Sequence, residues 1–125
     1  MLLDSSAWIY YLNRARLNAE QLQQICVSPP IIQEVLQGIK DERAHERVKN
    51  GLLAMPCLGS PLSLDTFLEA SEIFRIGRKK GKTIRATIDC LIAAVAINAK
   101  IPVMHRDRDF DEIAKFTALT ISPQW

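Results

Sequence analysis

The sequence predicts an α/β fold, a three-layer α/β/α sandwich around a mostly parallel central sheet. Short apolar runs of strand length alternate along the chain with longer segments whose apolar residues recur at helical spacing. Strands that alternate with helices in this way form parallel sheets covered by helices. With 125 residues, 48% of them apolar and 24% charged, the chain is long enough for a core and fits one domain over residues 1–125.

The first half of the chain predicts two strands and three helices. In order, we expect a strand, two helices and a second strand at residues 1–3, 4–12, 17–25 and 25–28. Ser5 and Ser6 are candidate N-caps for the first of these helices. A third helix begins after Ser28, has two prolines in its first turn, and is expected to run toward residues 50–51.

The second half continues the alternation. In order, we expect a strand, two helices, a strand, a short helix and a last strand at residues 55–64, 66–80, 87–100, 101–104, 109–116 and 117–121. Asp65 can cap the first of these helices, and Gly81 ends it behind a cationic last turn. The helix at 87–100 is apolar nearly all round, and we therefore expect it to be buried.

Charge and cysteine content exclude several classes of protein. The net charge of +2 is too small to establish nucleic-acid binding by itself. Cys26, Cys57 and Cys90 lie in apolar surroundings without a CxxC or Cys/His cluster, which indicates buried, reduced thiols rather than a disulfide framework or a zinc site. We expect no signal peptide, because the first residues lack a basic region and a long apolar region. The longest apolar run, residues 90–97, is shorter than the roughly 20 residues that cross a bilayer. We expect a soluble, cytoplasmic protein with no membrane association.

Two carboxylates follow predicted strands. Asp4 ends the first apolar run, and Asp107 comes soon after the run at residues 101–104. If both strands are parallel, both side chains leave the sheet at the same edge, where open α/β sheets build their sites. The alternative role for Asp4 is that of a helix cap.

The stretch at residues 105–113, His-Arg-Asp-Arg-Asp-Phe-Asp-Glu-Ile, holds four carboxylates that repel one another. We divide them into two groups. Asp107 belongs to the site, with Asp109 as an auxiliary residue. Asp111 and Glu112 are predicted to lie in the first turn of a short helix, where their charges complement the helix dipole.

Two further carboxylates lie in apolar helices. Asp89 begins an otherwise apolar helix, and an ionised carboxylate is costly to bury unless it is paired, hydrogen-bonded, protonated or bound to a metal. A pairing with Arg85, four residues earlier, is the structural alternative. Glu34 lies on or beside the inward face of its helix, or else at an edge that reaches water.

We therefore predict a catalytic site formed by Asp4, Glu34, Asp89 and Asp107. Of these, Asp4, Asp89 and Asp107 are the predicted metal ligands. Ligation by oxygen alone suits Mg²⁺ or Mn²⁺, and such a site supports metal-assisted hydrolysis of phosphodiester bonds. Ser6 either orients a metal-bound water or caps its helix.

A basic segment at residues 75–85 leads directly into the helix of Asp89. Its candidate substrate contacts are Arg75, Arg78, Lys79 and Arg85. Beside the site, these cations could hold a nucleic-acid backbone through its phosphates. The alternative is a solvated basic helix end.

Four motifs resemble the PIN-domain family and, within it, the VapC toxins of toxin–antitoxin pairs. They read LLDSSAWIYYL, SPPIIQEVLQGI, GKTIRATIDCLIAAVAI and HRDRDFDEIA, and they cover nearly the whole chain. The acidic residues of the family carry over as Asp4, Glu34, Asp89 and Asp107, with Asp109 as a variable fifth. The sequence departs from the family pattern at Tyr10, where many relatives carry an acidic residue, and at His105, where many carry Thr or Ser.

The resemblance implies a PIN-like sandwich, endoribonuclease activity that depends on Mg²⁺ or Mn²⁺, and self-association as a homodimer or higher homo-oligomer. It also implies inhibition by a cognate antitoxin, which we expect to insert a basic residue into the site. The alternative is a catalytically silent PIN-like module that binds RNA or an antitoxin. A receiver domain would need a paired acidic motif on the first strand and a lysine after the last, and the sequence has neither.

Overall fold

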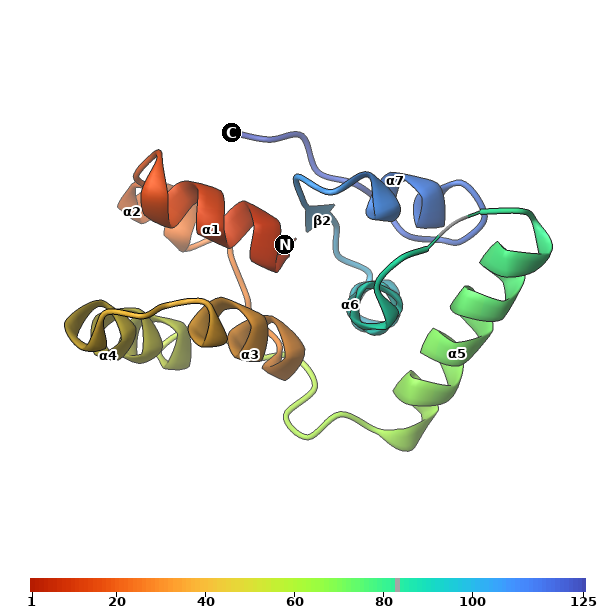
Figure 1. Cartoon of the computed structure of the whole chain (residues 1–125), viewed down its shortest axis with the longest axis horizontal. Helices are drawn as coiled ribbons and strands as arrows, with labels where there is room; N and C mark the ends of the chain where they lie inside the picture. The colour runs from red at the N-terminus through yellow and green to blue at the C-terminus, as the bar shows by residue number, and fades with distance from the viewer. Residues whose placement is uncertain (83) are drawn as a thin grey trace.

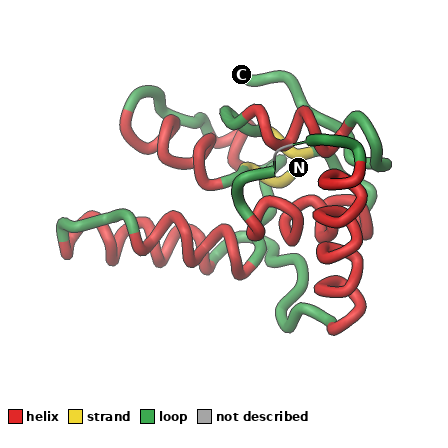
Figure 2. The backbone as a smooth tube through the Cα atoms, turned by 45° about the vertical axis from the view of Figure 1, so that its right-hand side comes forward, coloured by secondary structure: helices red, strands yellow, loops and turns green. Residues whose placement is uncertain are grey.

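The computed structural model describes residues 1–82 and 84–125, so Thr83 of the basic segment 75–85 lies outside the described residues. Over the described part, the chain is an α/β protein with helices packed around a small parallel sheet (Figures 1 and 2). The elements are β1 (Leu2–Leu3), α1 (Ser5–Asn13), α2 (Ala19–Leu22), α3 (Pro29–Gln37), α4 (Glu42–Leu53), α5 (Leu64–Lys79), α6 (Thr87–Ala99), β2 (Val103–Met104) and α7 (Arg108–Ala114). The predicted α/β class and the parallel sheet are confirmed.

The sheet is narrow, but isolated bridges extend it on both sides. β1 pairs with β2 in parallel, in the register Leu2–Val103 and Leu3–Met104. Further parallel bridges join Leu2 to Cys26, Val27 to Cys57, and Val103 to Ile121. These pairings place short segments side by side in the order 57, 26–27, 2–3, 103–104 and 121. The chain order reverses between β1 and β2, which is where open parallel sheets place their sites.

Most of the predicted strands are longer than the observed ones. The segments predicted at 25–28, 55–64 and 117–121 contribute isolated bridges rather than strands, two from the first segment and one from each of the others. Beyond Cys57 the chain turns at Gly59, whose φ of 70° is a left-handed conformation that glycine adopts without steric cost. Extended backbone therefore stops within a residue or two of the bridge, and the predicted length of this strand is wrong.

The single helix predicted from Ser28 to residues 50–51 is also wrong, because two helices occupy this stretch. A short turn separates α3 from α4. Asp41 begins α4 as its N-cap, and its side chain accepts a hydrogen bond of 2.8 Å from the backbone N–H of Ala44. This bond satisfies a donor that a helix start would otherwise leave without a partner, so a new helix can begin here. Upstream, α2 forms a single turn within the helix predicted at 17–25.

Two N-cap predictions are corrected in the same way. Asp4 caps α1, in place of Ser5 or Ser6, and Ser63 caps α5, in place of Asp65. In both cases the capping side chain belongs to the last extended residue before the helix. An N-cap must have non-helical backbone angles while its side-chain oxygen reaches forward to a free N–H. The predicted residues lie one or two positions too far into the helix.

The central helix of the molecule is α6, in agreement with the buried helix predicted at 87–100. Ala93, Ala94 and Ala96 are fully buried. Figure 1 shows α6 end-on between α1–α4 on one side and α5 and α7 on the other. Asp89, in the first turn of this helix, is 6% exposed. The fold therefore buries a carboxylate that belongs to its most apolar helix.

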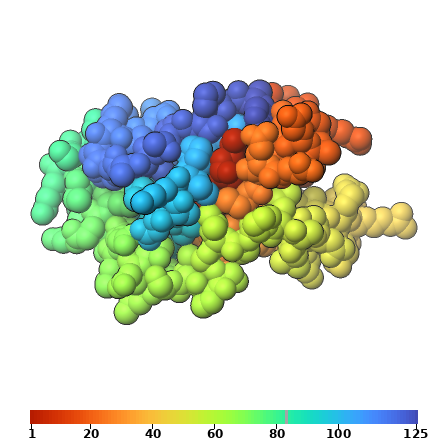
Figure 3. All heavy atoms as spheres, turned by 180° about the vertical axis from the view of Figure 1, so that it is seen from behind, coloured from red at the N-terminus to blue at the C-terminus, as the bar shows by residue number. Residues whose placement is uncertain are grey.

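The surface has two further features. α4 forms an arm at one end of the molecule (Figure 3). The outer face of α5 exposes large apolar side chains, Leu64, Phe67 and Leu68. None of the described helices combines the length and apolar character needed to cross a bilayer.

Candidate functional site

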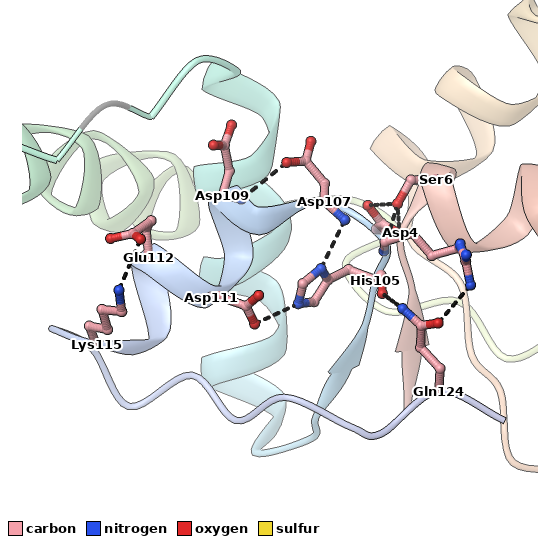
Figure 4. A network of polar contacts seen from close by, with 10 residues as sticks. Asp4, Ser6, His105, Asp107, Asp109, Asp111, Glu112, Lys115 and Gln124 are labelled. Carbon is pink, nitrogen blue, oxygen red and sulfur yellow. Dashed lines mark hydrogen bonds and ion pairs between the residues drawn. The ribbon is translucent and has the colours of Figure 1, made fainter.

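Three carboxylates come together near the end of β2. Asp89 lies in the first turn of α6, Asp107 is the N-cap of α7, and Asp109 lies in the first turn of α7. Each offers one oxygen, and these three oxygens lie within 4.8 Å of one another. The carboxylates of Asp107 and Asp109 point the same way (Figure 4). Asp109, expected as an auxiliary residue, is therefore a central member of the cluster.

Asp4 lies at the end of β1 and is fixed by hydrogen bonds within its own segment. Its Oδ1 accepts a bond of 2.9 Å from the N–H of Ala7, and the hydroxyl of Ser6 lies 2.7 and 2.8 Å from the two carboxylate oxygens. Burial raises the pKa of Asp4 above its ordinary value, and these hydrogen bonds oppose the rise. Asp4 is thus both a helix cap and a buried carboxylate beside the site.

Ser6 has a role beyond the two that were considered from the sequence, orienting a metal-bound water or capping its helix. While its hydroxyl donates to Asp4, its oxygen accepts a hydrogen bond of 2.9 Å from the N–H of Arg106. Arg106 belongs to the segment that follows β2. Ser6 therefore connects the ends of the two paired strands at the edge where the carboxylates gather (Figure 4).

Asp89 has the most perturbed ionisation of the group. Burial, followed by repulsion from Asp107, Asp4, Asp109 and Glu34, raises its pKa to about 7. Its Oδ2 is buried and has no hydrogen-bond partner among residues 1–82 and 84–125. The alternative considered from the sequence, an ion pair between Asp89 and Arg85, is wrong, because Arg85 pairs with Asp107 and Asp109 instead. Asp89 is therefore an uncompensated carboxylate in a region of negative charge.

Glu34 approaches the group from α3, on the Asp4 side. It is half-buried, and its Oε1 is a buried oxygen that has no hydrogen-bond partner in the described part of the chain. Burial raises its pKa, and repulsion from Asp4 adds to the rise, whereas the side chain of Ser5 opposes it. Glu34 thus lies near the carboxylates that converge from β1, α6 and α7.

Arg85 is the basic residue that reaches the cluster. Its Nη2 lies 3.4 Å from Asp107 Oδ1, and its Nε lies 3.6 Å from Asp109 Oδ1. Its backbone N–H also donates to Asp109 Oδ2 at 3.3 Å. A guanidinium therefore partly neutralises two of the three clustered carboxylates, from a side chain that is 57% exposed.

The other predicted substrate contacts lie along α5. Arg75 forms an exposed ion pair with Glu72 on the same helix, and the guanidinium of Arg78 lies over the ring of Phe74, 5.6 Å from its centroid. Lys79 is the last residue of α5. These three cations form a basic helix end, while Arg85 alone of the four is seen to contact the acidic cluster within the described residues.

His105 is a residue that the sequence interpretation left out. It is buried, its Nδ1 lies 3.0 Å from the backbone N of Asp107, and its Nε2 lies 2.9 Å from Asp111 Oδ1 (Figure 4). The available signals were its position directly after a strand and its departure from the family pattern. Neither signal could reveal the contact with Asp111, which depends on how α7 folds back.

The two acidic residues assigned to the helix start behave differently from each other. Asp111 does lie in the first turn of α7, as predicted, but it also contacts His105. Glu112 lies beyond the first turn and pairs with Lys82 at 3.2 Å and with Lys115 at 2.9 Å. These two lysines lower the pKa of Glu112. Glu112 is therefore part of a surface ion-pair network rather than of the site.

The donor set of the cluster fits a hard divalent cation. Asp89, Asp107 and Asp109 supply oxygen atoms, and the cluster contains neither a cysteine nor a histidine. The unpartnered Oδ2 of Asp89 is an orphaned buried acceptor, and a cation would satisfy it and relieve the repulsion among the carboxylates. The residues present are therefore suited to binding a metal.

A parallel sheet with clustered carboxylates at its reversal point defines an α/β protein with a candidate site for a divalent metal. Residues 1–116 match the family model described as PIN domain. The chain belongs to the PIN-domain family. It is 39% identical, over 131 aligned residues that include 95% of each chain, to VapC ribonuclease Mb1587 of Mycobacterium bovis and to ribonuclease VapC11 of Mycobacterium tuberculosis. Within the PIN family it belongs with the VapC ribonucleases.

Solved structures share the fold at low sequence identity. A chain of VapBC2 from Rickettsia felis, solved with a DNA fragment from its promoter, matches with a TM-score of 0.74 and 19% identity over 97% of this chain and 96% of that one. A chain of VapBC-1 from nontypeable Haemophilus influenzae matches with a TM-score of 0.73 and 20% identity over 97% and 95%. At this identity the likeness concerns the fold alone.

Proposed function

We propose that this protein is a metal-dependent endoribonuclease and the toxin of a toxin–antitoxin pair. One observation carries the proposal: a chain of the VapC family brings Asp89, Asp107 and Asp109 within metal-binding distance at the reversal point of its sheet. We also propose that residues 1–125 act as one domain, with the complete three-layer sandwich of the PIN fold. Cys90 is buried, whereas Cys26 is half-buried and Cys57 is exposed, so the expectation that all three thiols are buried is wrong. All three cysteines are free, which suits a reducing compartment, so we place the protein in the cytoplasm.

In this proposal the carboxylates have different roles in metal binding and catalysis. Asp89, Asp107 and Asp109 hold Mg²⁺ or Mn²⁺, and Asp4, predicted from the sequence as a metal ligand, contributes negative charge and an oxygen ligand from the β1 side. A bound divalent cation would supply activation of a water and neutralisation of the scissile phosphate. Glu34 completes the site, because its unpartnered Oε1 is free to accept a hydrogen bond or a proton from an attacking water.

The proposed substrate is RNA, held next to the carboxylates by cations. Arg85 is suited to a phosphate because a guanidinium that already reaches the cluster can turn toward a phosphodiester beside it. Arg75, Arg78 and Lys79 extend this positive charge along α5. Their contribution would be mainly sequence-independent attraction to the RNA backbone.

The proposed partners are an antitoxin and further copies of the chain. We expect the antitoxin to insert an Arg or Lys side chain among Asp4, Asp89 and Asp107, because a cation from a partner relieves the same repulsion as a metal. The relatives solved as VapBC complexes support this partner class. The exposed apolar face of α5 supports self-association as a homodimer or higher homo-oligomer.

The test is RNA cleavage by the purified protein with Mg²⁺, with Mn²⁺ and with a chelator. We expect cleavage that needs the metal and that falls by orders of magnitude in Asp107→Asn, which keeps the shape of the side chain but removes its charge. Asp65→Asn is the matched control, because Asp65 is exposed in the first turn of α5, and it should cleave normally. RNA binding without cleavage under every metal condition would instead identify a catalytically silent binding module.

A further inference from the structure

We propose that His105 is a positioning residue for the acidic site: it holds the backbone of Asp107 through Nδ1, and Asp111 fixes the imidazole through Nε2. The proposal rests on the proposed function only in that the site is taken to bind a divalent cation. The three residues and their contacts are drawn in Figure 4. Within the described residues, the ring of His105 bonds to the backbone of Asp107 and to Asp111 but to none of the clustered carboxylate oxygens, so it acts on the site through Asp107.

The hydrogen bonds determine which ring nitrogen carries the proton. The backbone N–H of Asp107 can only donate, and it lies 3.0 Å from Nδ1 of His105, so Nδ1 must be the acceptor. The proton of the neutral ring is then on Nε2, which donates to Asp111 Oδ1 at 2.9 Å. Two partners on opposite sides of the ring therefore select one tautomer and one orientation.

Packing prevents the ring from leaving this orientation. The side chain of His105 is 8% exposed, and its ring lies against the fully buried ring of Phe110, with the centroids 5.4 Å apart. Gln124 donates a hydrogen bond of 2.9 Å to the carbonyl of His105 and so holds the main chain from the segment that follows the bridge at Ile121. The imidazole is thus held in one place and orients the residues that follow it in the chain.

The position of Asp107 depends on the ring of His105. Its N–H is held by His105, and its Oδ1 accepts a hydrogen bond of 3.0 Å from the N–H of Asp109. Displacing the backbone of Asp107 would therefore move two of the three oxygens that form the cluster. Residues that orient metal-binding side chains typically change metal affinity by about 10- to 100-fold when they are replaced.

A purely structural role for His105, as a filler of the space beside Phe110, makes a different prediction. Any side chain of similar size would then serve equally well. In the positioning role, the two nitrogens have separate tasks, and amide side chains can separate them. Asn can place an acceptor oxygen near the position of Nδ1, whereas Gln can reach toward Asp111 but offers no acceptor at the δ position.

The experiment measures Mn²⁺ affinity and thermal melting for wild type, His105→Asn and His105→Gln. We expect His105→Asn to keep the affinity of wild type within about threefold and His105→Gln to lose about tenfold or more. Asp111→Asn keeps an acceptor for Nε2 and should retain the affinity, whereas Asp111→Ala should lower it. Equal Mn²⁺ affinities in the Asn and Gln variants of His105 would overturn the proposal.

A spectroscopic measurement on wild type protects the test against variants that fail to fold. The ¹⁵N shifts of the His105 ring should show an unprotonated Nδ1 and a protonated Nε2, and the opposite tautomer would also overturn the proposal. Both measurements are independent of RNA. If the protein cleaves no RNA while His105→Gln still weakens Mn²⁺ binding and His105→Asn does not, the ribonuclease proposal fails and the positioning role stands.

Discussion

Ser6 and Arg106, one hundred positions apart in the sequence, are joined by a hydrogen bond of 2.9 Å from the Arg106 N–H to the Ser6 hydroxyl. The same hydroxyl donates to the carboxylate of Asp4, so a single oxygen connects the segment after β1 to the segment after β2. These segments carry Asp4 and Asp107 into the site. The bond therefore sets the separation of two carboxylates that leave neighbouring strands.

The first prediction follows from this connection. Ser6→Ala removes the donor to Asp4 and leaves the N–H of Arg106 without its acceptor. Because this bond is exposed, water can take the place of the lost acceptor, and the variant should lose about 0.5–1.5 kcal/mol of the free energy of unfolding, which chemical denaturation can measure. Ser71→Ala is the matched control, because Ser71 is exposed and its hydroxyl bonds locally to the carbonyl of Leu68. Equal losses in the two variants would show that the connection between the strand ends is not stabilising.

The second prediction separates stability from function at Asp89. Burial and four neighbouring carboxylates disfavour its ionised form, so Asp89→Asn should leave the metal-free protein at least as stable as wild type. Added Mg²⁺ should raise the melting temperature of the variant less than that of wild type, because stabilisation by a ligand follows its affinity for the folded state. A melting series with and without Mg²⁺ tests both statements. A variant that melts well below wild type without metal would mean that Asp89 is a structural residue.

The third prediction concerns Arg85 as a cation inside an acidic site. Arg85→Ala should strengthen Mn²⁺ binding, because the guanidinium no longer competes for oxygens of Asp107 and Asp109. It should also weaken RNA binding and reduce the slope of log affinity against log salt by about 1, as expected for the loss of one phosphate contact. Arg75→Ala should leave Mn²⁺ binding unchanged, because Arg75 pairs with Glu72 on the surface of α5. The idea fails if the two variants bind Mn²⁺ alike.

The fourth prediction tests the packing that holds α5 against the approach to α6. A Cβ on Gly77 would lie 2.6 Å from Cδ1 of Ile84 and 3.1 Å from Cζ of Phe116. Overpacking costs about 1–3 kcal/mol, and the gain of about 0.5–1 kcal/mol that Ala brings to a helix offsets part of it, so Gly77→Ala should destabilise the fold by up to about 2 kcal/mol. Gly51→Ala is the opposite case, since nothing lies within 4 Å of a Cβ there, and it should stabilise α4 by about 0.5–1 kcal/mol. Thermal melting of the two variants should shift in opposite directions.

Much of the fold could be predicted because it depends on local patterns. The apolar run before Asp4 and the run before Asp107 were both recognisable as buried strands, and they pair in parallel as expected. The apolar helix around Asp89 is buried for the same reason that made it recognisable: it has no polar face to expose. Strand lengths and the break between α3 and α4 were missed, because a helix or strand ends wherever a cap or turn competes successfully with its continuation. Asp41 and Gly59 are the residues that do so here.

The candidate site shows where local pattern stops being informative. Spacing along the chain identifies a carboxylate that follows a strand or interrupts an apolar helix, since both properties belong to one segment. It assigns Asp109 to the site and Asp111 to the helix start, but it does not reveal that Asp109 offers an oxygen within 4.8 Å of those of Asp89 and Asp107, or that Asp111 contacts His105. Likewise, Arg85 lies four residues from Asp89 but pairs with carboxylates more than twenty positions away. Such pairings depend on how α6, α7 and the strand ends pack. The packing of two segments sets the distance between their charged groups, whatever the separation of those groups along the chain.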